Sequence, residues 1–184
     1  MPRSGFNGVD FEDNINFERL HSERLERAKK FLHESEFGAL LCYDFDNIRY
    51  ITGTHVGEWN RNKMNRHCLL IDGYDQPILF DPACPSKRQR VSWIRPENIM
   101  PAVGSMRGSI PASVGMVQQE VEEIISYLKK HDVFDQPLGI DIVDIPLYQE
   151  LERAGVKIGD GQAVMVNARM IKTDDEIQLL KCSG

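Results

Sequence analysis

The chain has 184 residues, 41% hydrophobic and 27% charged, a composition typical of one globular domain that can bury a core without metals or disulfides. Its net charge of -6 argues against non-specific nucleic-acid binding, which requires an excess of Lys and Arg. No apolar run approaches the ~20 residues that span a bilayer, and the first residues lack the apolar core of a signal peptide. We therefore expect a cytoplasmic protein with no membrane or nucleic-acid partner.

The N-terminal region predicts a flexible segment, a helix and a strand. Residues 1–15 show no period and are rich in Gly, Asn and Asp. From Asn16 apolar residues recur with the spacing of an amphipathic helix. Residues 37–43 form a short apolar run that is typical of a buried strand. A short helical turn is expected to end near Gly53, since glycine often terminates helices.

A β-hairpin follows the stretch that carries the first tryptophan. Residues 68–71 and 78–80 are short apolar runs, and Asp72 and Gly73 between them have the chemistry of a tight turn. Residues 85–94, which include several cations, are predicted to form a surface helix.

The second half alternates helices with strands. The strongest helical period covers residues 117–134, and residues 138–142 read as a strand. The remaining predicted elements are a helix at 146–155, a strand at 156–161, a helix at 162–172 and the start of another helix at 174–181. Crossover helices imply parallel strands and the hairpin implies an antiparallel pair, so we predict an α/β layered domain with a mixed β-sheet flanked by helices.

No local motif assembles a complete catalytic or metal site. Gly159 and Gly161 follow a predicted strand, but Val164 stands where a dinucleotide fingerprint needs Gly or Ala, which favours a simple tight turn. The five histidines belong to no close cluster of His, Asp and Glu, so no metal ligands are predicted in this chain. His55 and His67 flank the tryptophan-bearing stretch and have the best claim to a site. The acidic residues at 120–123 are expected on a solvated helix face.

The four cysteines form no CxxC pair and are expected to be reduced and structural. Cys84 is the one weak candidate for a nucleophile, because cations follow it closely and would lower a thiol pKa at the start of a helix.

Two segments carry a resemblance to a known family. The first is "RLERAKKFLHESEFGALLCYDFDNIRYITG", and the second is "ARMIKTDDEIQLLK" near the C-terminal end. Together, over about residues 17–182, they resemble the N-terminal domain of the creatinase/prolidase/aminopeptidase P family, the "pita-bread" enzymes. The stretch "FDNIRYITGTHVGEWNRNKMNRHCLLI" is more similar to the creatinase and lyase branch.

The resemblance implies an α/β domain of ribonuclease H-like topology that is inactive alone. It implies a flexible segment at 1–15, the domain at 16–170, and at 171–184 the start of a linker into a missing C-terminal catalytic domain. That domain would hold the divalent metal, so we expect no cofactor here. The expected partners are the chain's own catalytic domain, a second copy in a homodimer, and a small-molecule or peptide substrate.

The resemblance also assigns a role to the stretch from His55 to Arg66. In creatinase-like members the corresponding loop supplies side chains to the neighbouring subunit's site. By position, Trp59, Asn60, Met64 and Arg66 match that loop and are the expected substrate-binding residues. Arg66 suits a carboxylate and Trp59 a pocket wall. The alternatives are a solvated loop with Trp59 packed on its own domain, and a stand-alone ligand- or protein-binding α/β domain without catalytic activity.

Overall fold

The computed structural model describes residues 15–57, 64–104 and 111–183. Within them lies a mixed six-stranded sheet with the strand order β4-β3-β2-β1-β5-β6. The strands are β1 (Ala39–Cys42), β2 (His67–Ile71), β3 (Ile78–Phe80), β4 (Ile99–Met100), β5 (Leu138–Ile140) and β6 (Ile158–Asp160). The helices are α1 (Phe17–His33), α2 (Phe45–Thr52), α4 (Cys84–Arg90), α5 (Met116–Lys130), α6 (Ile145–Arg153), α7 (Gln162–Met170) and α8 (Asp174–Ser183), with short 3-10 turns at Pro96–Asn98 and Ala112–Val114.

Strand directions follow from the connections. The hairpin is confirmed: β2 pairs antiparallel with β3 and also with β1. The crossover helices α5 and α6 place β5 parallel to β1, and β6 parallel to β5. Strand β4, which we did not predict, pairs parallel with β3 through two residues only. The predicted α/β architecture with a mixed sheet is therefore confirmed.

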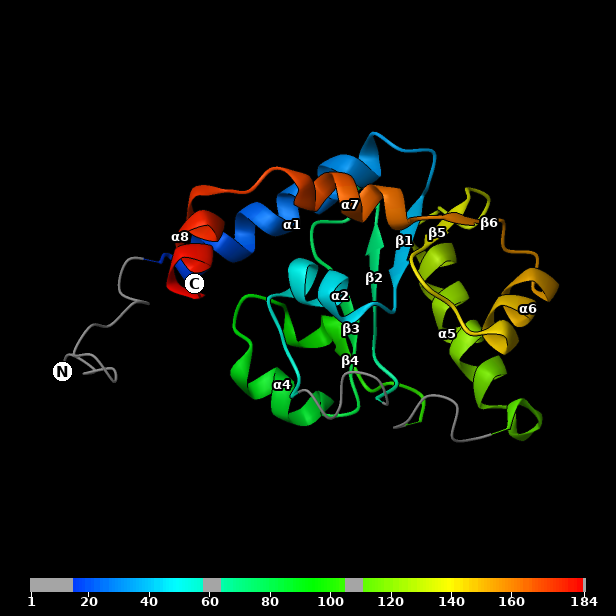
Figure 1. Cartoon of the computed structure of the whole chain (residues 1–184). Helices are drawn as coiled ribbons and strands as arrows, with labels where there is room; N and C mark the ends of the chain where they lie inside the picture. Colours follow the sequence, from blue (N-terminus) through cyan, green and yellow to red (C-terminus); the bar gives the residue numbers. More distant parts are fainter. Residues whose placement is uncertain (1–14, 58–63, 105–110, 184) are drawn as a thin grey trace.

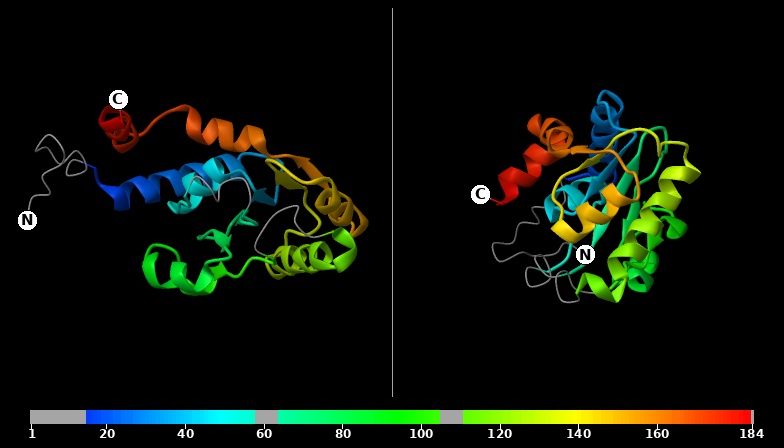
Figure 2. Two further views of the ribbon diagram at one scale, coloured as in Figure 1. Left: turned by 60° about the horizontal axis from the view of Figure 1, so that its bottom comes forward. Right: turned by 90° about the vertical axis from the view of Figure 1, so that its right-hand side faces the viewer.

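Alternation along β1 divides the core into two layers, because successive strand residues point to opposite faces. Leu40 and Cys42 belong to the layer under α1, α2, α4 and α7, whereas Ala39 and Leu41 belong to the layer under α5 and α6. Figures 1 and 2 show these helix groups on opposite sides of the sheet. Helix α8 lies away from the sheet, beside the N-terminal half of α1 (Figure 1).

The two glycines that suggested a tight turn serve close packing. A Cβ atom on Gly159 would lie 2.5 Å from Phe37 Cε1, and one on Gly161 would lie 2.8 Å from the backbone of Gly139. These contacts leave no room for side chains where β6 leads into α7. The chain passes from β6 to α7 through Gly161 alone, so the predicted tight strand-to-helix turn is confirmed.

Candidate functional site

A buried polar cluster lies at the end of the sheet where β1 and β3 finish and β2 begins. It adjoins both ends of the stretch that the sequence marked as a candidate loop. Its members are Tyr43, Thr54, Asn65, Arg66, His67, Asp81 and Glu120, each less than 9% exposed. Such a concentration of buried polar groups is unusual, because each must find partners to offset its lost hydration.

Arg66 and Asp81 form the charged half of the cluster. Arg66 Nε lies 2.8 Å from Asp81 Oδ2, and neither side chain is exposed. Asp81 also accepts a hydrogen bond from the backbone N–H of Ala83 at 2.7 Å. Burial lowers the pKa of Arg66, and the Asp81 carboxylate acts in the opposite direction. The prediction that Arg66 lies on an exposed surface loop is therefore wrong, because its guanidinium is paired inside the domain.

Arg66 also closes the base of the candidate loop. Its Nη2 atom donates a hydrogen bond to the hydroxyl of Thr54, so the residues that bracket 55–65 are joined directly. Lys87 of α4 donates to the backbone carbonyl of His55 at 3.0 Å. Since a hydrogen bond to a charged donor is stronger than a neutral one, these contacts fix where the stretch leaves and re-enters the domain.

The second half of the cluster centres on Glu120 of α5. The Tyr43 hydroxyl donates to Glu120 Oε1 at 2.5 Å, and His67 Nδ1 lies 3.4 Å from the same oxygen. Asn65 donates to Glu120 Oε2 at 3.1 Å. The His67 ring stacks on Phe80 with centroids 4.3 Å apart. These donors satisfy the hydrogen-bonding capacity of the buried Glu120 carboxylate.

Of the four expected substrate-binding residues, the structure describes Met64 and Arg66. Trp59 and Asn60 lie outside the described residues. Met64 is half-buried, and Arg66 is buried. His55 is exposed, while His67 lies in the cluster.

The roles of Tyr43, Asp81 and Glu120 were not predicted from the sequence. The prediction that Glu120 lies on a solvated helix face is wrong, since Glu120 is only 7% exposed. A signal existed: Glu120 lies one helical turn after Val117 and one before Ile124, on the apolar stripe of α5.

The weak candidate nucleophile is inert in this fold. Cys84 is buried, and its thiol donates to the backbone carbonyl of Ile99 at 3.2 Å. Burial, the largest influence, raises the pKa of its thiol, although Arg88 opposes that change. A reactive cysteine needs the reverse, an exposed thiol of lowered pKa.

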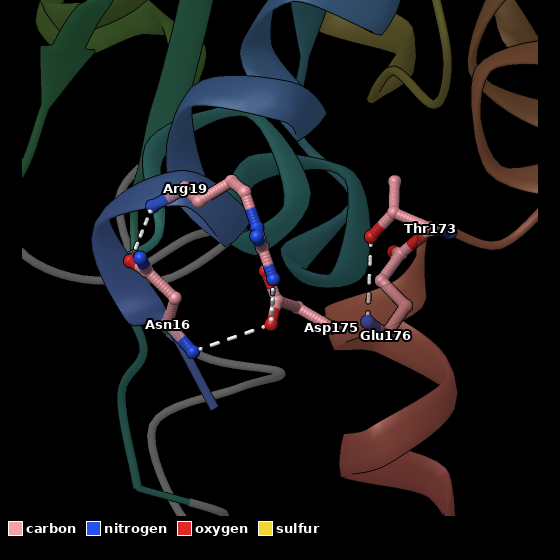
Figure 3. Close-up of polar contacts among 5 residues, drawn as sticks. All are labelled: Asn16, Arg19, Thr173, Asp175 and Glu176. Carbon is pink, nitrogen blue, oxygen red and sulfur yellow. Dashed lines mark hydrogen bonds and ion pairs between the residues drawn. The ribbon is translucent and has the colours of Figure 1, made fainter. Parts of the chain in front are cut away.

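A second polar assembly joins α1 to the start of α8 (Figure 3). Asp175 accepts hydrogen bonds from Arg19 Nε at 2.7 Å, from Arg19 Nη2 at 3.0 Å and from the backbone N–H of Asn16 at 3.2 Å. Glu176 pairs with Arg24 at 2.9 Å. The hydrogen bonds from Arg19 are the main reason that the pKa of Asp175 is lowered.

Thr173 and Glu176 form a capping box at this helix start. The backbone N–H of Thr173 donates to Glu176 Oε2 at 3.0 Å, and the backbone N–H of Glu176 donates to Thr173 Oγ1 at 3.3 Å (Figure 3). The Arg19–Asp175 and Arg24–Glu176 pairs thus hold the start of α8 on α1, and the capping box fixes the first turn of α8 itself.

Neither a metal centre nor a membrane span is found in the described part of the chain. Among those residues no three His, Cys, Asp or Glu side chains are grouped so as to hold a metal ion. None of their helices combines the length and the apolar character needed to cross a membrane.

Comparison with known proteins identifies the type of domain to which this fold belongs. Residues 24–171 match the model of the creatinase/prolidase N-terminal domain, which is most of the chain. The chain therefore belongs to the creatinase/prolidase N-terminal domain family. Its fold resembles an Xaa-Pro aminopeptidase from Streptococcus pyogenes (15% identity, TM-score 0.58, 83% of this chain and 99% of that one) and an Xaa-Pro dipeptidase from Bacillus anthracis (17%, 0.59, 90% and 39%).

Two sequence relatives are named dimethylsulfoniopropionate lyase DddP. The protein from Roseovarius nubinhibens is 25% identical over 178 residues, covering 90% of this chain and 37% of its own. The protein from Roseobacter denitrificans is 28% identical over 160 residues, covering 80% and 33%. The chain thus spans about a third of the length of these relatives.

Proposed function

We propose that this chain is the non-catalytic N-terminal domain of a larger creatinase/prolidase-type metal-dependent enzyme. The observation that carries the proposal is the pattern of coverage. Nearly the whole chain aligns with the lyase from Roseovarius nubinhibens, yet it accounts for only 37% of that protein. The catalytic divalent metal would then be held by residues outside the described part of this chain, and no step of a reaction is assigned to residues here.

The substrate class that the relatives favour is a sulfonium carboxylate. Both are named as lyases of dimethylsulfoniopropionate. Such a reaction breaks a C–S bond and releases dimethyl sulfide, acrylate and a proton. A peptidase reaction on X-Pro substrates is the second candidate, supported by the matched fold alone.

In this proposal the domain helps to form a homodimer and shapes the substrate pocket. Trp59, Asn60 and Met64 would line a pocket completed by another polypeptide segment. Arg66 would contribute indirectly. Its contacts with Asp81 and Thr54 anchor the stretch that carries Trp59, Asn60 and Met64. A cytoplasmic location remains part of the proposal, and the net charge of -6 supports the absence of a nucleic-acid partner.

The test compares the 184-residue chain with the longer protein encoded by the same gene. Each is supplied with divalent metal and assayed for dimethyl sulfide release from dimethylsulfoniopropionate and for cleavage of an X-Pro dipeptide. We expect the shorter chain to be inactive in both assays and the longer protein to be active in the first. A reading frame that stops at Gly184, or turnover by the shorter chain, would contradict the proposal and favour a stand-alone domain or a different enzyme. Analytical ultracentrifugation of the longer protein tests the dimer.

A further inference from the structure

A cavity of about 420 Å³ opens where α1, α2, α7 and α8 meet. Four cations line it: Arg24, Arg49, Arg169 and Lys172. Two carboxylates accompany them, those of Asp46 and Glu176, which leaves a local excess of two positive charges. The chain as a whole has 22 Lys and Arg against 28 Asp and Glu, so this pocket has a charge opposite to that of the protein.

The Glu176 carboxylate forms part of the pocket wall together with Arg24. Glu176 lies 2.9 Å from Arg24, and its other oxygen accepts the backbone N–H of Thr173. Both side chains are largely buried, at 17% exposure for Arg24 and 5% for Glu176. The Arg24–Glu176 pair is therefore neutral overall, and the excess charge comes from the remaining cations.

Arg169 is held in place without losing its charge. Its Nη1 atom donates to Asn47 Oδ1 at 2.8 Å, and an amide oxygen is neutral. Asn47 is fully buried and is itself fixed, because its Nδ2 donates to Asp141 and to Gln162 at 3.0 and 3.1 Å. Asp141 in turn accepts hydrogen bonds from the backbone N–H groups of Tyr43 and Asp44, which follow β1, at 2.8 and 3.0 Å. A guanidinium oriented in this way needs little reorganisation to bind an anion.

The other walls suit a small organic anion. The Arg24 guanidinium lies over the Tyr50 ring, 5.3 Å from its centroid, which further restricts its orientation. Lys172 folds back to donate to the carbonyl of Arg169, next to the pocket. Leu179 of α8 supplies an apolar side. The cavity volume falls in the range of small-molecule sites, about 300–1,000 Å³.

We propose that this pocket binds a small dianion, a phosphate monoester or a dicarboxylate, through Arg169, Arg49 and Lys172. The charge of the ligand matches the local excess of two, and guanidinium groups favour planar or tetrahedral anions that accept two parallel hydrogen bonds. Docking of α8 on α1 forms one wall of the site, so the pocket exists only while that contact holds.

The experiment titrates the 184-residue chain with inorganic phosphate and, separately, with succinate at constant ionic strength. Binding is followed by calorimetry and by backbone amide shifts, with acetate as a monovalent control. We expect saturable binding of a dianion at one site, with shifts at Arg49, Arg169 and Lys172. The dianion that binds more tightly assigns the ligand class.

Charge-removing variants locate the site. Arg169→Gln and Arg49→Gln should each weaken binding about tenfold, as expected for loss of one charge-assisted hydrogen bond. Arg90→Gln removes an exposed cation of α4 and should leave the affinity unchanged. Arg49 is exposed, so its variant tests the site even if Arg169→Gln perturbs folding, which circular dichroism would reveal. Binding that does not saturate, or that Arg90→Gln weakens as much as the pocket variants do, would overturn the proposal.

Discussion

Arg66 and Asp81 form an ion pair from which solvent is wholly excluded, with Nε and Oδ2 2.8 Å apart. The pair joins the start of β2 to the end of β3, and Arg66 extends the link to Thr54. The two ends of the stretch between Thr54 and Arg66 are therefore joined to each other and to β3. Four measurements follow from this and related contacts.

Removal of the buried arginine should be strongly destabilising. Arg66→Met leaves the Asp81 carboxylate buried without its counter-charge, which costs about 3–5 kcal/mol of the free energy of unfolding. Arg95→Gln is the matched control, since Arg95 pairs with Asp75 at the surface, where exposed pairs contribute less than about 1 kcal/mol. Urea denaturation measures both. Equal effects of the two substitutions would show that burial does not set the strength of the inner pair.

The hydroxyl of Tyr43 should contribute to stability through Glu120. Tyr43→Phe removes a donor to a buried carboxylate, and hydrogen bonds to charged groups contribute about 1.5–3 kcal/mol. Tyr148→Phe removes a hydroxyl from a partly exposed ring of α6 and should change the free energy of unfolding by about 0.5 kcal/mol or less. A Tyr43→Phe protein as stable as the parent would mean that Glu120 is satisfied without it.

Helix α8 should loosen from α1 in acid. Arg19 lowers the pKa of Asp175 below its ordinary value of 3.8, so the folded state favours the ionised carboxylate. The contribution of this pair is therefore complete above pH 3.8 and is lost as the pH falls from there toward the lowered pKa. The nearby acids Glu23 and Asp174, like Asp175, raise the pKa of Arg19.

A spin label on Cys182 reports the motion of α8. We expect the label to become more mobile below pH 3.8 in the parent, and to be mobile already at pH 7 in Asp175→Asn. Asp174→Asn changes the adjacent exposed carboxylate and should behave like the parent. If both variants release the label equally at pH 7, the Arg19–Asp175 contact is not what holds the helix.

The label is selective because Cys182 is exposed, whereas the other three cysteines are buried. Burial raises the pKa of Cys42, Cys68 and Cys84, that of Cys68 to about 12, so their reactive thiolates are scarce at neutral pH. A thiol reagent should therefore react quickly with about one group in the native protein and with all four after denaturation. Rapid native labelling of Cys84, located by mass spectrometry, would revive it as a candidate nucleophile.

Much of the fold follows from local patterns. The apolar run at residues 37–43 contains β1 because a central strand covered on both faces is apolar throughout. Asp72 and Gly73 predicted the β2–β3 hairpin because a tight reversal needs a residue that tolerates positive φ, and Gly73 has φ of +75°. Strand β4 escaped prediction because two residues carry no period. They form a strand only because β3 offers its free edge to Ile99 and Met100.

The sequence by itself determined the layered α/β class, the order of its main elements and the resemblance to the creatinase/prolidase domain. Those conclusions depend on spacings within one element, which a linear pattern records. Only the tertiary structure decided that Arg66 and Glu120 lie inside, and that Arg24, Arg49 and Arg169 share one pocket. A charged side chain is buried when a partner from another element compensates it, and the chain brings those partners together only by folding.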